Sequence, residues 1–270
     1  MSLREKISRI VALVGIVVFG FLWFFKPTYS ADEEWNFLIQ STLYHVLGSI
    51  IFLSLSVYLG FRLWNAPRLA FLAVLLPCLA VVINNCPFIA LANGEAWVER
   101  YDMLPLFLVD CLLIGVFEEL AFRGTLFPAI LESRRSTRGQ IFWTALISSA
   151  VFGLVHLANL FEGAGIVATL LQVGYSFLIG GMCAIVLLKS GNIIFSILLH
   201  GIFDIGGRLI DTLGRGKIWN LPTVVITAVL AVAVTAWMLW VLFRIDPSET
   251  DRLYPTKQEN EVEKNEHVED

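Results

Sequence analysis

Three ionisable residues fall within six positions of a long apolar run, where two carboxylates and an arginine could support acid–base chemistry. Glu118, Glu119 and Arg123 lie in a stretch from about 104 to 127 that is otherwise rich in Leu, Phe, Val and Ile. A helix of this length, rising about 1.5 Å per residue, can cross the roughly 30 Å hydrocarbon core of a bilayer. Ionisable groups at that depth are costly and usually face a bundle interior or a wet cavity. The stretch therefore predicts an intramembrane polar site.

The spacing within this stretch separates the roles of its charged residues. Glu119 and Arg123 are four residues apart with the acid first, which favours an ion pair on one helix face. Such a pair is explained by structure alone, because pairing offsets part of the desolvation of both groups. Glu118 points about 100° away around the helix, so it is the candidate general base. The alternative is that Glu118 bonds to a neighbouring helix and holds the bundle together.

Two histidines lie in later apolar runs. His156 has Asn159 three residues further along, on the same helix face. His200 and Asp204 are four residues apart, so the carboxylate could fix the imidazole tautomer or hold the ring charged. Taken alone, His156 can be a packing residue, and His200 with Asp204 can be a pair that only stabilises the helix. Together with Glu118 they supply the groups needed to deprotonate a water molecule and stabilise an oxyanion.

Other polar residues in the apolar runs are weaker candidates. Gln172 and Tyr175 are three residues apart and could line the same cavity, or bond between helices. With Asn159 they are the candidate substrate-binding residues. Asp110 stands nearer the outer end of its run and is expected to be wetted. His45 has no acidic partner in its own run, and we interpret it as structural.

Composition places the whole chain in a membrane. Hydrophobic residues make up 57% of the 270 residues and charged residues 16%, against roughly 25% in soluble domains. We predict an all-α, polytopic membrane protein with about eight transmembrane helices around an intramembrane polar site. The predicted spans are 7–25, 36–61, 68–91, 104–127, 140–161, 164–189, 192–210 and 221–244.

These spans predict four regions along the chain. Residues 1–103 hold three N-terminal spans, 104–210 hold the fourth to seventh spans as the catalytic core, and 211–245 hold the eighth. Residues 246–270 are polar and rich in Asp and Glu, so we expect a disordered acidic tail.

Charge distribution predicts the orientation and limits the partners. If the N-terminus is cytoplasmic, the segments on the cytoplasmic side contain more Lys and Arg than those on the outer side. We therefore expect a multi-pass protein of the cell membrane with both the N-terminus and the tail in the cytoplasm. The outer connection 208–217 is the exception, with three positive charges. The net charge of −4 comes from the tail, so the charge pattern does not predict a nucleic-acid-binding surface. The sequence carries no signal for the oligomeric state.

The motifs together resemble a known family. Glu-Glu-x-x-x-Arg, Phe-x-x-x-His and His-x-x-x-Asp follow one another on separate predicted helices. They are similar to the motifs of the CPBP intramembrane proteases, the CAAX prenyl endopeptidase and bacteriocin-processing (Abi) family. The resemblance covers roughly 104–206. It implies that Glu118 activates water, that His156 helps to hold this water, and that His200 binds the oxyanion.

In the same resemblance, Glu119 and Arg123 position the site. Asp204 stands where other members have Asn, and an ionised Asp can accept a hydrogen bond but not donate one. Asp204 therefore either carries a proton or orients His200. We expect no metal cofactor; the alternative is zinc bound by Glu118, His156 and His200.

Three functions are compatible with this inventory. The first is an intramembrane endopeptidase that hydrolyses a peptide bond in a membrane-associated protein or peptide, using a water activated by Glu and His. The alternative is a non-catalytic membrane protein that binds a peptide in bacteriocin self-immunity. A proton-coupled transporter is the third, because buried carboxylates and histidines also form proton relays, but the sequence has no inverted repeat.

Overall fold

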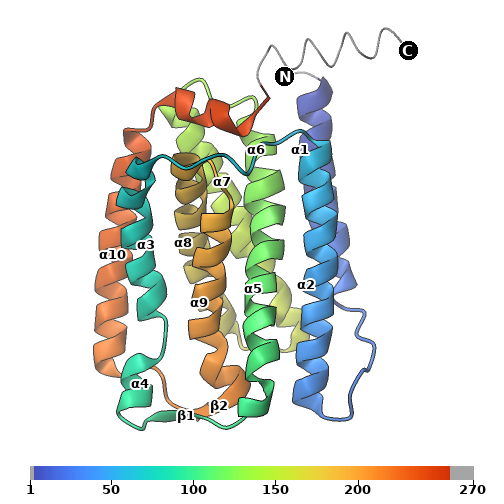
Figure 1. The fold of residues 1–270 in the computed structure, drawn as a ribbon, viewed down its shortest axis with the longest axis vertical. Coiled ribbons are helices and arrows are strands. Elements are labelled where there is room, and N and C mark those ends of the chain that lie inside the picture. Colours follow the sequence, from blue (N-terminus) through green and yellow to red (C-terminus); the bar gives the residue numbers. More distant parts are fainter. Residues whose placement is uncertain (1–2, 256–270) are drawn as a thin grey trace.

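The structure of this chain, a computed structural model, describes residues 3–255. It is all-α, with 78% of the residues in helices, as the sequence predicted. The long helices are α1 (Leu3–Leu22), α2 (Glu33–Tyr58), α3 (Leu72–Asn84), α5 (Leu104–Ala121), α7 (Arg138–Val155), α8 (Ile166–Ser190), α9 (Ile194–Leu213) and α10 (Leu221–Phe243). Their axes lie roughly along one line, some pointing up and some down, with α1 and α2 on one flank and α3 and α10 on the other (Figure 1).

Short elements connect these helices. They are η1 (Leu69–Phe71), α4 (Phe88–Ala92), β1 (Ala96–Val98), η2 (Tyr101–Met103), η3 (Phe122–Leu126), α6 (Phe127–Leu131), η4 (His156–Glu162), β2 (Gly214–Gly216) and η5 (Pro247–Leu253). The strands β1 and β2 pair antiparallel and join the start of α5 to the end of α9, at the lower end of the bundle in Figure 1. This small sheet was not predicted from the sequence.

Among residues 3–255, four helical stretches are long and apolar enough to cross a membrane. They are Glu33–Tyr58, Arg138–Glu162, Ile166–Ser190 and Leu221–Phe243, so the chain is a multi-pass membrane protein. The predicted count of eight spans is therefore not confirmed. In α5 and α9, apolar character is interrupted by three Asp, Glu or Arg residues each: Asp110, Glu118, Glu119, Asp204, Arg208 and Asp211.

Two of the predicted spans are divided. The run 68–91 breaks after Asn84, because the residue before Pro87 is disfavoured in helical geometry and the proline lacks an N–H to continue the ladder. The run 104–127 changes to one turn of π-helix, η3, before α6 begins. Pro128 is the second residue of α6, and a wider turn accommodates a proline that cannot donate to the preceding turn.

Close approach of two backbones sets α5 against α9. A Cβ added at Gly115 would lie 2.9 Å from both the amide nitrogen of Gly201 and the carbonyl oxygen of Ile197. Small residues at such a contact allow helices in a membrane to pack closely. The side chains of the two helices on either side of this contact are therefore brought within bonding distance.

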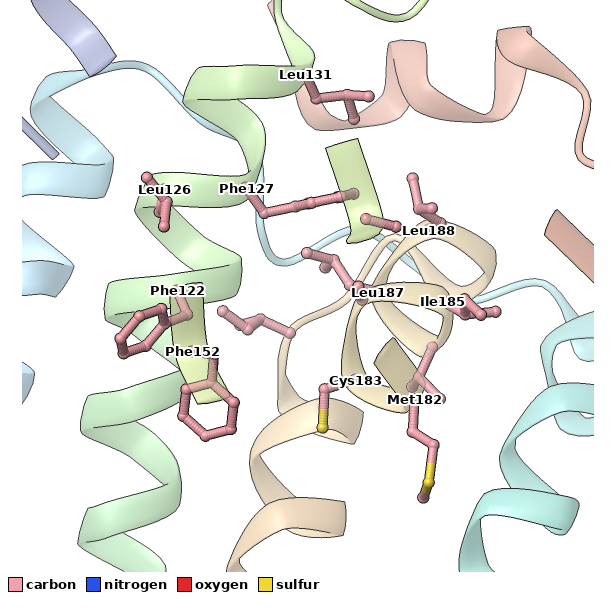
Figure 2. Packing of buried hydrophobic residues seen from close by; sticks show 14 of the residues in the cluster. Phe122, Leu126, Phe127, Leu131, Phe152, Met182, Cys183, Ile185, Leu187 and Leu188 are labelled. Atoms are coloured by element: carbon pink, nitrogen blue, oxygen red, sulfur yellow. The ribbon is translucent and has the colours of Figure 1, made fainter. Parts of the chain in front are cut away.

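A dense apolar core lies beside this contact. Figure 2 shows aromatic and aliphatic side chains from η3 and α6 packed with those of α7 and α8. Phe122, Leu126, Phe127 and Phe152 are all 4% exposed or less. This core fixes the end of α5, where the charged residues are located.

The predicted disordered tail is wrong for its first part. Residues 247–253 form η5, and Leu253 and Tyr254 are buried. The hydroxyl of Tyr254 donates to the carbonyl of Pro128 at 2.7 Å, and Lys189 pairs with Glu249 at 2.7 Å. These apolar and pairing groups attach the stretch to the bundle despite its acidic composition. The rest of the predicted tail, 256–270, lies outside the described residues.

Candidate active site

The candidate site lies between two antiparallel helices. Glu118 and Glu119 occupy the last turn of α5, and His200 and Asp204 lie near the middle of α9. The two helices run side by side in Figure 1 and pack extensively. Residues more than 80 positions apart in the sequence therefore meet between them.

His200 is the centre of this group. Its Nδ1 lies 2.8 Å from Oε1 of Glu119, while its Nε2 lies 3.4 Å from Oε2 of Glu118 and 3.8 Å from Oδ2 of Asp204. The imidazole is 4% exposed. Three carboxylates thus surround one buried ring, and the two nitrogens of that ring face different carboxylates.

The two adjacent glutamates have different surroundings. The side chain of Glu119 is completely buried and pairs with Arg123, their Oε1 and Nη1 atoms being 3.1 Å apart. The side chain of Glu118 is 19% exposed. Glu119 is therefore enclosed by protein on all sides, whereas Glu118 can be reached by a water molecule or a substrate.

Arg123 is held in a closely fitted pocket. It is fully buried, and its guanidinium carbon lies 4.2 Å above the ring of Phe152, which is a favourable cation–π position. On α8, a Cβ added at Gly180 would lie 2.7 Å from Nη2 of Arg123. A glycine at this position leaves room for the guanidinium beside Glu119.

His156 stands next to the site but does not bond to its carboxylates. Its Nδ1 lies 2.9 Å from the carbonyl oxygen of Phe152, which can only accept, so this nitrogen carries the proton. The Phe152 ring packs edge-on against both histidines, with centroid distances of 5.3 Å to His156 and 5.6 Å to His200. Within residues 3–255, no hydrogen bond or ion pair joins His156 to Glu118, Glu119 or Asp204.

The three candidate substrate-binding residues divide into a bonded pair and an edge residue. Asn159 of η4 donates to Gln172 of α8 at 2.7 Å, which ties these two elements together. Tyr175 is 46% exposed and packs against Phe203, with ring centroids 5.8 Å apart. Tyr175 thus borders the site, and substrate binding by all three stays a prediction.

The zinc alternative has no matching ligand set in this structure. Across the described residues, no three His, Cys, Asp or Glu side chains are grouped so that they could hold a metal ion. Of the suggested ligands Glu118, His156 and His200, the two histidines are separated by the ring of Phe152. The expectation of a site without a metal cofactor stays a prediction.

A second polar cluster was missed. Asp110, expected to be wetted, is completely buried and accepts a hydrogen bond from Arg208 at 3.0 Å. His45, interpreted as having no acidic partner, lies 3.5 Å from the same carboxylate. Arg208 belongs to α9 rather than to the outer loop, which removes one of the positive charges that contradicted the predicted topology. The signal was its position four residues after Asp204, on the same face of the helix.

Comparison with known proteins places this arrangement in a family. Residues 100–206 match the family model described as Type II CAAX prenyl endopeptidase Rce1-like. This part of the chain is similar to the CAAX prenyl endopeptidases. The match confirms the family that the motifs resembled, and it indicates protease activity on a membrane protein or peptide. Searches of curated proteins and of solved structures found no match.

The matched range has a clear relation to the two polar clusters. It includes Glu118, Glu119, His156, His200 and Asp204. It ends at residue 206, before Arg208. The candidate active site is therefore inside the family match, while one partner of the second cluster lies beyond it.

Proposed function

We propose that this protein is an intramembrane endopeptidase in which Glu118 activates water to hydrolyse a peptide bond of a membrane-associated protein or peptide. The observation that supports this most directly is the pairing of one buried imidazole with three carboxylates, of which Glu118 is partly exposed and Glu119 fully enclosed. A base must be reachable by water, and a positioning group is better enclosed.

The contacts of His200 give each atom a role. Nδ1–H donates to Glu119 and fixes the ring orientation, so Nε2 faces Glu118 and Asp204. A water bound to Glu118 loses a proton to this carboxylate as its oxygen attacks the carbonyl carbon of the substrate. In this scheme His200 carries a proton on both ring nitrogens, so the oxyanion that forms accepts a hydrogen bond from its Nε2–H. When the C–N bond breaks, Glu118 returns the proton to the leaving amine.

The remaining residues support this reaction. Arg123 neutralises Glu119, so that Glu119 keeps accepting from His200. Asp204, with its Oδ2 3.8 Å from Nε2 of His200, orients the ring by electrostatic attraction. His156 has Nδ1 engaged with a backbone carbonyl, which leaves its Nε2 lone pair to hold the water or the substrate from the side of η4. Asn159, Gln172 and Tyr175 line the path of the substrate along η4 and α8.

We further propose that the enzyme works in the cell membrane without a metal cofactor, with its N-terminus and C-terminal tail in the cytoplasm. The donor set gives no reason to route the reaction through a metal. Stoichiometric zinc in active, purified protein, lost together with activity on chelation, would replace this mechanism with a metal-assisted one.

The decisive experiment compares peptide termini in membranes and medium from cells carrying the wild type or Glu118→Gln. The substitution is nearly isosteric and removes the base. Specific termini are expected in the wild type and in Glu33→Gln, which changes an exposed glutamate at the start of α2, but not in Glu118→Gln. Identical termini in all three would refute the protease. Protection from a bacteriocin that survives in Glu118→Gln would instead support the self-immunity function.

A further inference from the structure

The second polar cluster joins three helices at one carboxylate. Asp110 of α5 accepts from Ser41 of α2 at 2.7 Å and from Arg208 of α9 at 3.0 Å. His45 of α2 lies 3.5 Å away. Asp110 is completely buried, while the side chain of Arg208 is 26% exposed. A buried carboxylate with this many partners has a fixed position, and it fixes the groups bonded to it.

The cluster is a second attachment along the same contact as the active site. His200 bonds to Glu119, and Arg208 bonds to Asp110. Arg208 lies eight residues after His200, which corresponds to about 12 Å along α9. Asp110 lies nine residues before Glu119, a nearly equal distance along α5. Because the helices are antiparallel, these spacings match, and Asp204 lies between the two attachments.

Between the two attachments, α5 and α9 can move little relative to each other. Gly115 and Gly201, which lie between the two ion pairs, let the two backbones come into close contact. One polar attachment beside this contact would let α9 slide or rotate about it. A second attachment two turns away determines both the axial position and the rotation of α9, and hence where His200 and Asp204 stand relative to Glu118.

We propose that the Asp110–Arg208 ion pair, supported by Ser41 and His45, is a positioning pair that sets the register of α9 against α5 and thereby the geometry of the catalytic group. This inference rests on the proposed protease function. Arg208 acts through α9 and Asp204 rather than on the substrate. The pair also explains why α2, which lies outside the family match, is bonded to the catalytic helices.

The test is a double-mutant cycle with Asp110→Asn and Arg208→Gln in the full-length protein, on a peptide identified from the wild-type termini. Each single variant should lower kcat by roughly tenfold to a hundredfold, because a misplacement near 1 Å can have that effect, while KM stays nearly unchanged. The double variant should be no worse than the worse single one, since both changes break the same link. Arg208→Lys should recover part of the kcat, because its ammonium still pairs with Asp110.

Arg215→Gln provides a matched control. Arg215 pairs with Glu99 at 2.9 Å just beyond α9, but its side chain is 70% exposed, so the same substitution there should leave kcat unchanged. The thermal unfolding of every variant shows which ones are folded. A folded Arg208→Gln with wild-type kcat, or a loss that Asp110→Asn does not share, would overturn the positioning pair. If Glu118→Gln also cleaves normally, the proposed function fails; if only the Arg208 variants do, the inference alone fails.

Discussion

Replacing Gly180 by alanine tests how closely the buried arginine is enclosed. The new Cβ would lie 2.7 Å from Nη2 of Arg123 and 3.2 Å from both the Phe152 ring and the Cα of Ser149. Ordinary van der Waals contact begins at 3.4 Å. The guanidinium or the helix must therefore give way by the difference, about 0.7 Å.

The guanidinium has no open direction in which to move. Arg123 is fully buried, and its guanidinium carbon lies 4.2 Å from the centre of the Phe152 ring. Phe152 in turn packs against His200. A displacement of Arg123 is therefore passed to Glu119 and to the imidazole bonded to it. Overpacking of this kind costs about 1–3 kcal/mol of stability, and a shift near 1 Å at the site can lower the rate by roughly 10²-fold.

Two other glycines of α8 are matched controls for this substitution. A Cβ at Gly174 would meet nothing within 4 Å, and one at Gly181 would meet its nearest atom at 3.7 Å. We expect Gly180→Ala to lower both the cleavage rate and the melting temperature, while the two control variants keep wild-type values. Measured rates and melting temperatures in detergent decide the matter. A Gly180→Ala protein that matches its controls in both would refute the reasoning.

Two further predictions concern the ends of the bundle. Tyr254→Phe removes the hydroxyl that donates to the carbonyl of Pro128 and should lower the free energy of unfolding by about 1 kcal/mol. Denaturation in detergent measures this change, and peptide cleavage should be retained. An unchanged free energy of unfolding would contradict the stabilising role of this hydrogen bond. Asp32 accepts from the backbone N–H of Trp35, and this bond together with the nearby Arg100 holds the pKa of its carboxyl below the usual 3.8. A lowered pKa means that this stabilisation is present above the usual value and is lost as the pH falls through the folded value. The difference in melting temperature between wild type and Asp32→Ala should therefore become smaller below a pH of about 4. A difference that does not change with pH would show that the Asp32 carboxylate does not stabilise the fold in this way.

Much of the site could be predicted because its parts are local. Glu119 with Arg123, and His200 with Asp204, are each four residues apart on one helix, and such pairs are visible in any helical reading of the sequence. Motif order then indicated that these helices meet. The enclosed position of Glu119 and the accessible position of Glu118 also follow from the predicted ion pair, which occupies one face of the helix.

Contacts between helices were harder to predict. Asp110 and His45 lie in different apolar runs, and nothing in either run shows that the two side chains face each other. Their meeting depends on the register between α2 and α5, which is set by packing over the whole interface. Phe152 was seen as part of a motif, but its packing against both histidines depends on where α7 lies relative to α9. The order of η5 likewise depends on two buried side chains inside an acidic stretch.

The charges between α5 and α9 fall into two kinds, and the difference points to where the chemistry occurs. Glu119 and Asp110 are fully buried carboxylates, and each is paired with an arginine, as the high cost of an unpaired charge in a membrane requires. Within residues 3–255, neither Glu118 nor Asp204 has an ion pair with an arginine, and both are partly exposed, at 19% and 16%. If all four carboxylates served only to hold the helices together, Glu118 and Asp204 would be poor choices, because they lack an arginine partner. A carboxylate without an arginine partner is what a site for activating water needs. A base that is already neutralised by an arginine is a poor acceptor of a proton.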